Sequence, residues 1–260
     1  MRSSFGVRPV VCAMLLAIVP LTSSCQMRES SDPTEFRLPA ATVTDIFGAG
    51  AVRDLARAAA AGKSEDVTRA VRAGADPNAK GKEGLTPLMW AIFANNAAGV
   101  TALIKAGANP NLPTRANNNG FEWDEYPVVT AAQTGKVAVL KALLDGGGDP
   151  ESRSHNTTAL HAAASCLDCV RLLVERGANV NRRIPEQGRF NVATAAVASG
   201  HLEVVAYLVE RGFNIELDKL AWNVQDIGGP ENKDPQKEKI VAMIRAKGIE
   251  PFVPEWAKKK

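Results

Sequence analysis

Several features are scarce in this 260-residue sequence, and each scarcity excludes something. Tyrosine occurs twice and cysteine four times, and charge of one sign does not dominate, with 31 Lys and Arg against 28 Asp and Glu. A nucleic-acid binder is expected to carry a clear basic excess, so this balance disfavours nucleic acid as a partner. The apolar run at residues 10–19 is too short to cross a bilayer as a stable helix, and no second candidate span follows it.

Motifs of catalysis are also missing. The sequence has no nucleophile elbow, no phosphate-binding glycine loop and no zinc-protease motif. Ser165, His161 and Asp168 could be combined on paper into a Ser-His-acid set, but a catalytic triad is recognised by geometry and not by composition. The sequence therefore predicts a protein that is not an enzyme and that needs no cofactor or metal.

One pattern recurs instead along most of the chain. Six times an apolar, helix-like run ends in a glycine, at positions 74, 107, 147, 177, 212 and 248, so that neighbouring glycines lie 30 to 40 residues apart. A period in this range predicts a stacked array of repeats. Such arrays offer an extended surface, so we expect function to lie in binding a partner.

The repeat at residues 81–113 shows how each unit folds. Thr86 can cap the first free N–H groups of a helix, and Pro87 suits the first helical position because its missing N–H costs nothing there. Asn95-Asn96 separates this helix from a second apolar stripe, which Gly107 ends in the left-handed conformation that glycine favours. The pattern predicts two short antiparallel helices followed by an extended finger.

These residues resemble the ankyrin repeat family. Its Thr-Pro-Leu-His-x-Ala signature is similar to Thr86-Pro87-Leu88-Met89-Trp90-Ala91 and to Thr158-Ala159-Leu160-His161-Ala162-Ala163, and repeat five keeps Gly200-His201-Leu202 in the family register. The resemblance implies an all-α ankyrin repeat solenoid of about six stacked helix-turn-helix units with finger loops. It covers residues 45–250, read as one domain with atypical repeats at both ends, and it implies a monomeric protein-binding module without nucleic-acid partners.

The N-terminus reads as an export signal. Arg2 and Arg8 precede the apolar run, and Leu21-Thr22-Ser23-Ser24-Cys25 follows it. Small residues before a cysteine resemble the bacterial lipobox, although Thr22 stands where that motif usually has Leu. The resemblance implies a signal peptide at residues 1–24 and a lipid on Cys25.

Sorting and the remaining boundaries follow from this reading. Gln26 after the cysteine implies anchoring at the periplasmic face of the outer membrane, and the alternative is ordinary cleavage near Ser24 that yields a soluble periplasmic protein. Residues 25–44, rich in Ser, Thr, Pro and charge, read as a flexible tether, and residues 251–260 as a C-terminal tail. Loss of Arg2 and Arg8 with the signal would lower the 31 basic residues to 29, against 28 acidic ones.

The two remaining cysteines, Cys166 and Cys169, fall where repeat four has lost residues between its helices. In an oxidising compartment a disulfide pinning the shortened turn is the favoured interpretation, and two free thiols are the alternative. A redox motif is disfavoured because the helical repeat context is not a thioredoxin-like one. A zinc site would need two more ligands.

The expected binding surface is the finger of repeat three, which carries extra residues between Thr114 and Glu125. Aromatic side chains interleaved with acids suit a protein-binding hot spot with a charged rim. The predicted contact residues are Phe93, Phe121, Trp123, Asp124, Glu125 and Tyr126. The alternative is that Phe121 and Trp123 fold back on the repeats. Arg182 and Arg183 in a later finger suggest a second, basic patch for an acidic partner.

Two functions remain open from the sequence. The first is a lipid-anchored periplasmic interaction module, in its sharpest form an immunity protein that neutralises a secreted, phospholipase-type effector, as resemblance to periplasmic ankyrin-type proteins implies. The alternative is a structural or stress-protective envelope factor that binds a resident periplasmic protein.

Overall fold

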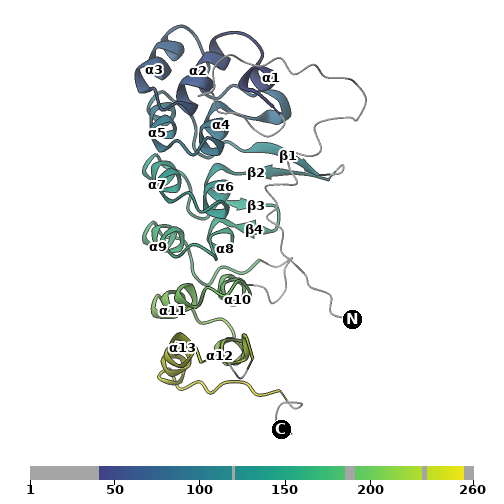
Figure 1. Cartoon of the computed structure of the whole chain (residues 1–260), viewed down its shortest axis with the longest axis vertical. Coiled ribbons are helices and arrows are strands. Elements are labelled where there is room, and N and C mark those ends of the chain that lie inside the picture. Colours follow the sequence, from purple (N-terminus) through teal and green to yellow (C-terminus); the bar gives the residue numbers. More distant parts are fainter. Residues whose placement is uncertain (1–40, 119–120, 185–190, 230–232, 255–260) are drawn as a thin grey trace. The chain divides into compact units, whose positions relative to one another are not determined.

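The computed structural model describes residues 41–118, 121–184, 191–229 and 233–254 (Figure 1), and most of them lie in paired helices. The pairs are α2 (Ala51–Ala60) and α3 (Ser64–Arg72), α4 (Pro87–Phe93) and α5 (Ala97–Lys105), α6 (Pro127–Gln133) and α7 (Val137–Asp145), α8 (Ala159–Ala162) and α9 (Leu167–Glu175), α10 (Val192–Ala198) and α11 (Leu202–Glu210), and α12 (Leu217–Asp226) and α13 (Pro235–Arg245). The predicted all-α class and the six helix pairs are confirmed within this described part of the chain.

The remaining elements are short. A helix, α1 (Val43–Phe47), precedes the first pair, and a 3₁₀ turn, η2 (Lys82–Gly84), precedes α4. Two antiparallel hairpins join β1 (Thr114–Asn118) to β2 (Phe121–Glu125) and β3 (Arg153–Ser154) to β4 (Thr157–Thr158). Val43 of α1 is almost fully buried, so packed structure begins before residue 45, where the sequence placed the start of the repeat domain.

The described residues group into two compact lobes. The N-terminal lobe contains the residues up to Pro127 together with Asp145–Gly148, and the C-terminal lobe contains Val128–Leu144 and the residues from Asp149 onward. In the N-terminal lobe α2 packs against α3, α4 and α5. In the C-terminal lobe α11 packs against α9, α10 and α13. The single domain predicted over residues 45–250 stays a prediction.

The helices begin and end where the sequence pattern places them. The Thr86 hydroxyl accepts a hydrogen bond from the Met89 N–H at the start of α4, and Asn96 caps α5 in the same way through the Gly99 N–H. The six repeat glycines all have φ between 78° and 101°, a region that a residue with a Cβ enters only with strain. Each repeat therefore stops its second helix by the same backbone device.

Each lobe has its own apolar core. In the N-terminal lobe Trp90 is completely buried and meets the Phe47 ring edge-to-face, with 6.2 Å between ring centroids. In the C-terminal lobe Phe213 and Leu208 are completely buried. Neither member of a helix pair could bury its apolar face alone, so burial of this kind requires neighbouring pairs to stack.

Asparagine side chains tie successive fingers together. Asn78 donates from Nδ2 to the Gly107 carbonyl at 2.9 Å and accepts from the Asn109 N–H at 2.7 Å. Asn181 repeats both contacts in the C-terminal lobe, with the Gly212 carbonyl and the Asn214 N–H. The backbone polar groups at the base of a finger are thus satisfied by the preceding finger.

Candidate functional site

The finger insertion of repeat three is an ordered hairpin, where the sequence predicted a loop. In β1 and β2, Thr114 lies opposite Glu125, and Ala116 lies opposite Trp123. Successive side chains of a strand point to opposite faces. One face of the hairpin, here called the inner face, therefore carries Thr114, Ala116, Trp123 and Glu125, and the other, the outer face, carries Arg115, Glu122 and Asp124.

The inner face is mostly buried. Thr114, Ala116 and Glu125 are each less than a tenth exposed, and Trp123 is partly exposed. The indole N–H of Trp123 donates to the Glu125 carboxylate at 3.1 Å. This bond satisfies the indole donor and fixes the orientation of the side chain. Part of the Trp123 ring stays exposed to solvent.

The outer face is charged and open to solvent. The Arg115 guanidinium lies 3.0 Å from the Glu122 carboxylate and 3.4 Å from that of Asp124, and all three side chains are about half exposed. The hydrogen bond to Glu122, followed by that to Asp124, raises the pKa of Arg115 above its ordinary value. One cation between two anions leaves this face with a net negative charge.

A second finger, in the C-terminal lobe, contains the predicted arginines. Arg182 forms an ion pair with Glu151 at 3.1 Å, and the other carboxylate oxygen of Glu151 accepts from the Asn179 N–H at 2.6 Å. Arg182 and Arg183 are both exposed. Because Glu151 neutralises Arg182, this surface presents less positive charge than the sequence alone suggests.

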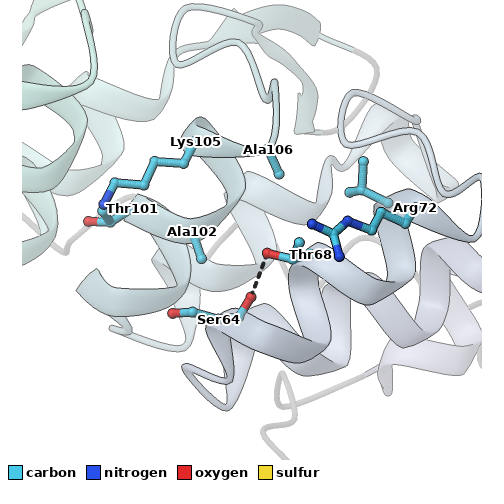
Figure 2. Close-up of a pocket in the computed structure, with 8 residues that line it drawn as sticks. Ser64, Thr68, Arg72, Thr101, Ala102, Lys105 and Ala106 are labelled. Carbon is cyan, nitrogen blue, oxygen red and sulfur yellow. Dashed lines mark hydrogen bonds between the residues drawn. The ribbon is translucent and has the colours of Figure 1, made fainter.

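A groove of about 250 Å³ lies between α3 and α5 of the N-terminal lobe. Figure 2 shows the side chains of these two helices that line it. Ser64 and Thr68 line it from α3, where the Thr68 hydroxyl donates to the Ser64 carbonyl at 3.0 Å. Arg72 and Lys105 add two exposed cations. The residues that line the groove occupy ordinary helix-surface positions, so it is a weaker candidate than the hairpin.

The cysteine pair lies at the start of α9. The structure joins Cys166 and Cys169 in a disulfide, with their Cα atoms 5.2 Å apart. Cys166 is the capping residue of the helix, and its sulfur accepts a hydrogen bond from the Cys169 N–H at 3.2 Å. The oxidation state of this pair in the cell stays a prediction.

Comparison with known families identifies the repeats. The family described as ankyrin repeats in three copies matches residues 113–184 and 128–219, and that described as a single ankyrin repeat matches residues 83–115. These matches together span residues 83–219, which is more than half of the chain.

The chain belongs to the ankyrin repeat family. Its ankyrin repeats confirm the predicted fold and identify a protein–protein interaction module. No curated protein matches the chain significantly.

The ankyrin architecture places the predicted contact residues on different elements. Phe93 ends α4 and is partly exposed, and Tyr126, also partly exposed, directly precedes α6. The structure brings Trp123 together with Glu125, and Asp124 together with Arg115. Glu125 therefore contributes to the buried side of the finger and not to a charged rim.

Two predicted positions lie outside what the structure describes. The backbone of Phe121 belongs to β2, but its side chain is not among the described ones. Cys25 lies outside the described residues altogether. Contact of either residue with a partner or a membrane stays a prediction.

Sequence reasoning missed the strand pairing of the finger. The signal was present, because Phe121 to Asp124 alternate between aromatic and acidic side chains and Asn119-Gly120 is a common hairpin-turn dipeptide. It also missed Glu151 as the partner of Arg182, since these two residues lie 31 positions apart in the sequence.

The histidine and aspartate of the possible Ser-His-acid set make structural contacts within the ankyrin repeats. His161 is buried, its Nδ1 lies 2.8 Å from the Thr158 hydroxyl, and burial lowers its pKa from 6.5 to about 4. Asp168 pairs instead with Arg171 at 3.6 Å. Among the described residues, no cluster of His, Cys, Asp and Glu side chains could hold a metal ion. In that same part of the chain, no helix has the length and apolar character needed to cross a membrane.

Proposed function

We propose that this ankyrin repeat protein is a lipid-anchored periplasmic interaction module, and that its β1–β2 hairpin contacts a protein partner. The observation that carries the proposal is the two-sided hairpin itself. Its inner face is buried and holds Trp123 through Glu125, while its outer face displays the Arg115, Glu122 and Asp124 cluster. Paired strands lose less conformational entropy on binding than an unpaired loop would.

The chemistry of the hairpin suits a protein partner better than a small molecule. Tryptophan and arginine dominate the energetic centres of protein interfaces, and Trp123 lies directly opposite Ala116, the neighbour of Arg115. The outer carboxylates of Glu122 and Asp124 outnumber the single guanidinium, so a partner surface with basic residues is expected.

The location in the cell is part of the proposal. Its support is the order of basic residues, the apolar run at 10–19 and the cysteine at 25 in the sequence. A lipid on Cys25 would hold the ankyrin repeats at the periplasmic face of the outer membrane. The alternative remains a periplasmic protein without a lipid.

Within this class, we favour an immunity protein that blocks a toxic effector delivered into the periplasm, with a phospholipase-type effector as the sharpest version. The support is an N-terminal sequence that resembles a lipoprotein export signal, together with a binding fold that has one distinctive finger. A structural or stress-protective envelope factor stays the second candidate. A deletion strain separates the two, because loss of the protein makes cells sensitive to attack by siblings that carry the effector only if the protein confers immunity.

The hairpin is tested on the partner isolated by affinity purification from the envelope fraction. Truncation of a buried interface tryptophan commonly costs about 2 kcal/mol or more, so Trp123→Ala should weaken binding by at least about 25-fold. The double change Glu122→Lys with Asp124→Lys should also weaken binding, without touching the inner face.

The control is Glu65→Lys, which makes one such reversal of charge on the exposed face of α3 in the same lobe. It should leave the dissociation constant unchanged. Circular dichroism must show that every variant keeps the helical content of the parent protein. If the hairpin variants bind as tightly as the parent, the contact surface lies elsewhere, and the fingers around Arg183 become the next candidate.

A further inference from the structure

The disulfide at the start of α9 has two sulfur atoms in very different surroundings. Cys169, the third residue of the helix, is completely buried. Val139 and Val204 hold the same third position in α7 and α11 and are completely buried too, so Cys169 occupies a core position of the repeat. Cys166 lies just outside the helix and is partly exposed. A thiol arriving from solvent can therefore reach Cys166 and cannot reach Cys169.

The helix start also favours negative charge on the sulfur of Cys166. The Cys169 N–H donates to that sulfur at 3.2 Å, and α9, with nine residues, adds the positive end of its dipole. Thiolates at such positions are stabilised, as in other Cys-x-x-Cys sites at helix starts. Asp168 works against this effect, but its carboxylate lies 3.6 Å from the Arg171 guanidinium.

Stability alone gives little reason for this disulfide. The cysteines are three positions apart, so the bond closes a very short loop, and loop closure stabilises a fold less as the loop shortens. Capping does not require it either. Asn96 caps α5 from the same position with a side-chain oxygen 2.9 Å from the Gly99 N–H.

The helical repeat context disfavoured a redox motif in the sequence, but the difference in exposure between the two sulfurs points the other way. We propose that Cys166 and Cys169 form a thiol–disulfide exchange site that oxidises a dithiol. The first thiolate of the dithiol attacks the sulfur of Cys166. The bond between the two cysteines breaks, and the sulfur of Cys169 leaves with the electron pair and takes up a proton. The second thiolate of the dithiol then attacks its own first sulfur in the mixed disulfide and releases Cys166 as a thiolate.

The balance of the exchange is two electrons and two protons. The dithiol becomes a disulfide, and Cys166 and Cys169 become thiols. A low-molecular-weight disulfide, of which oxidised glutathione is the test compound, restores the bond between them by the reverse steps. This chemistry needs neither the hairpin nor the anchor, so it stands or falls separately from the proposed function.

The test uses the full chain with Cys12→Ser and Cys25→Ser, which leaves Cys166 and Cys169 as its two cysteines. Dithiothreitol serves as the dithiol, and quenched samples are read by mass spectrometry. Two further variants separate the sulfurs without disturbing the fold. Cys169→Val introduces valine, the residue type found at the equivalent buried positions Val139 and Val204. Cys166→Asn introduces asparagine, the residue type that caps α5.

We expect dithiothreitol to reduce the parent disulfide under native conditions and oxidised glutathione to restore it. The Cys169→Val variant should form a glutathione adduct on Cys166 at least about tenfold faster than the Cys166→Asn variant forms one on buried Cys169, since exchange requires access to the sulfur. Ser165→Ala is the matched control, because Ser165 is exposed and directly precedes Cys166. Its disulfide should exchange at the parent rate.

Two results would overturn the proposal. One is a disulfide that resists dithiothreitol in the native protein and yields only in urea, which would make it purely structural. The other is equal adduct formation by Cys169→Val and Cys166→Asn, which would remove the difference in access on which the site depends.

Discussion

His161 is the residue whose burial has the clearest consequence for stability. It is 7% exposed, and burial lowers its pKa from 6.5 to about 4. The unfolded chain has no such burial, so its imidazole titrates near 6.5. Between these two pH values the unfolded state binds more protons than the folded state, and acid therefore favours unfolding.

For the parent protein this predicts a free energy of unfolding that is at its full value above pH 6.5. It should fall as the pH drops, by about 3 kcal/mol at pH 4 on account of His161 alone. His161→Asn removes the titration and keeps a polar group beside the Thr158 hydroxyl, so its loss over the same range should be smaller. Urea unfolding at pH 7 and pH 4.5 measures the difference. Equal losses of unfolding free energy in the parent protein and in His161→Asn would show that His161 is not the cause.

Gly99 carries a second prediction at this scale. Gly→Ala inside a helix normally stabilises a protein by up to about 1 kcal/mol. At Gly99 a Cβ would lie 1.8 Å from the Ala59 carbonyl oxygen of α2, so helices α2 and α5 would have to separate. We expect Gly99→Ala to destabilise the protein by about 1–3 kcal/mol instead.

The neighbouring exposed change Ala98→Gly isolates helix propensity, because Ala98 faces solvent one residue earlier in α5. It should cost at most about 1 kcal/mol. Thermal or urea unfolding compares the two variants. A Gly99→Ala protein more stable than the parent would show that the helices tolerate a larger separation.

Among the elements, the helices follow from the sequence and the finger does not. Thr86, Pro87 and Gly107 mark helix starts and stops by local chemistry, which depends on nearby residues alone. The hairpin depends on which strand faces which, and the ion pair of Arg115 with Glu122 spans seven positions. Strand pairing is a non-local choice, so composition suggested a loop where register produced two distinct faces.

The candidate site shows the same division. The sequence located the finger and Trp123, because an insertion breaks the repeat period visibly. It assigned Glu125 to the rim, and the structure turns that side chain inward to the Trp123 indole. The alternation of side chains between the two faces of β2 decides this orientation. The orientation can be predicted from the sequence only after residues 121–125 are recognised as a strand.

The asparagine bridges between fingers join neighbouring repeats in addition to the packing of their helices. Asn181 binds both the Gly212 carbonyl and the Asn214 N–H through its side chain. Asn181→Ala removes both hydrogen bonds and should destabilise the C-terminal lobe by about 1–2 kcal/mol. Asn214→Ala is the matched control, because Asn214 uses its backbone N–H and should change stability by less than about 0.5 kcal/mol. Equal effects in urea unfolding would refute the bridging role.

For the whole molecule, the ankyrin repeats and the proposed anchor have different kinds of support. The repeats rest on a periodic pattern, on helix pairs and on family matches over residues 83–219. The anchor rests on the order of residues around Cys25 and is a proposal. A tethered binding module would meet its partner at a high local concentration near the membrane, which raises the occupancy of even a moderate interface.

The anchor predicts where the protein goes when Cys25 is changed. A covalently attached acyl chain contributes about 0.8 kcal/mol per buried methylene to membrane binding, so loss of the acylated cysteine should abolish that attachment. Cys25→Ser should move the protein from the membrane fraction to the periplasmic extract and end incorporation of labelled fatty acid. Cys12→Ser, inside the apolar run, should change neither result. If the parent protein is already extracted without detergent and carries no labelled fatty acid, the anchor is contradicted. The protein is then a periplasmic protein without a lipid.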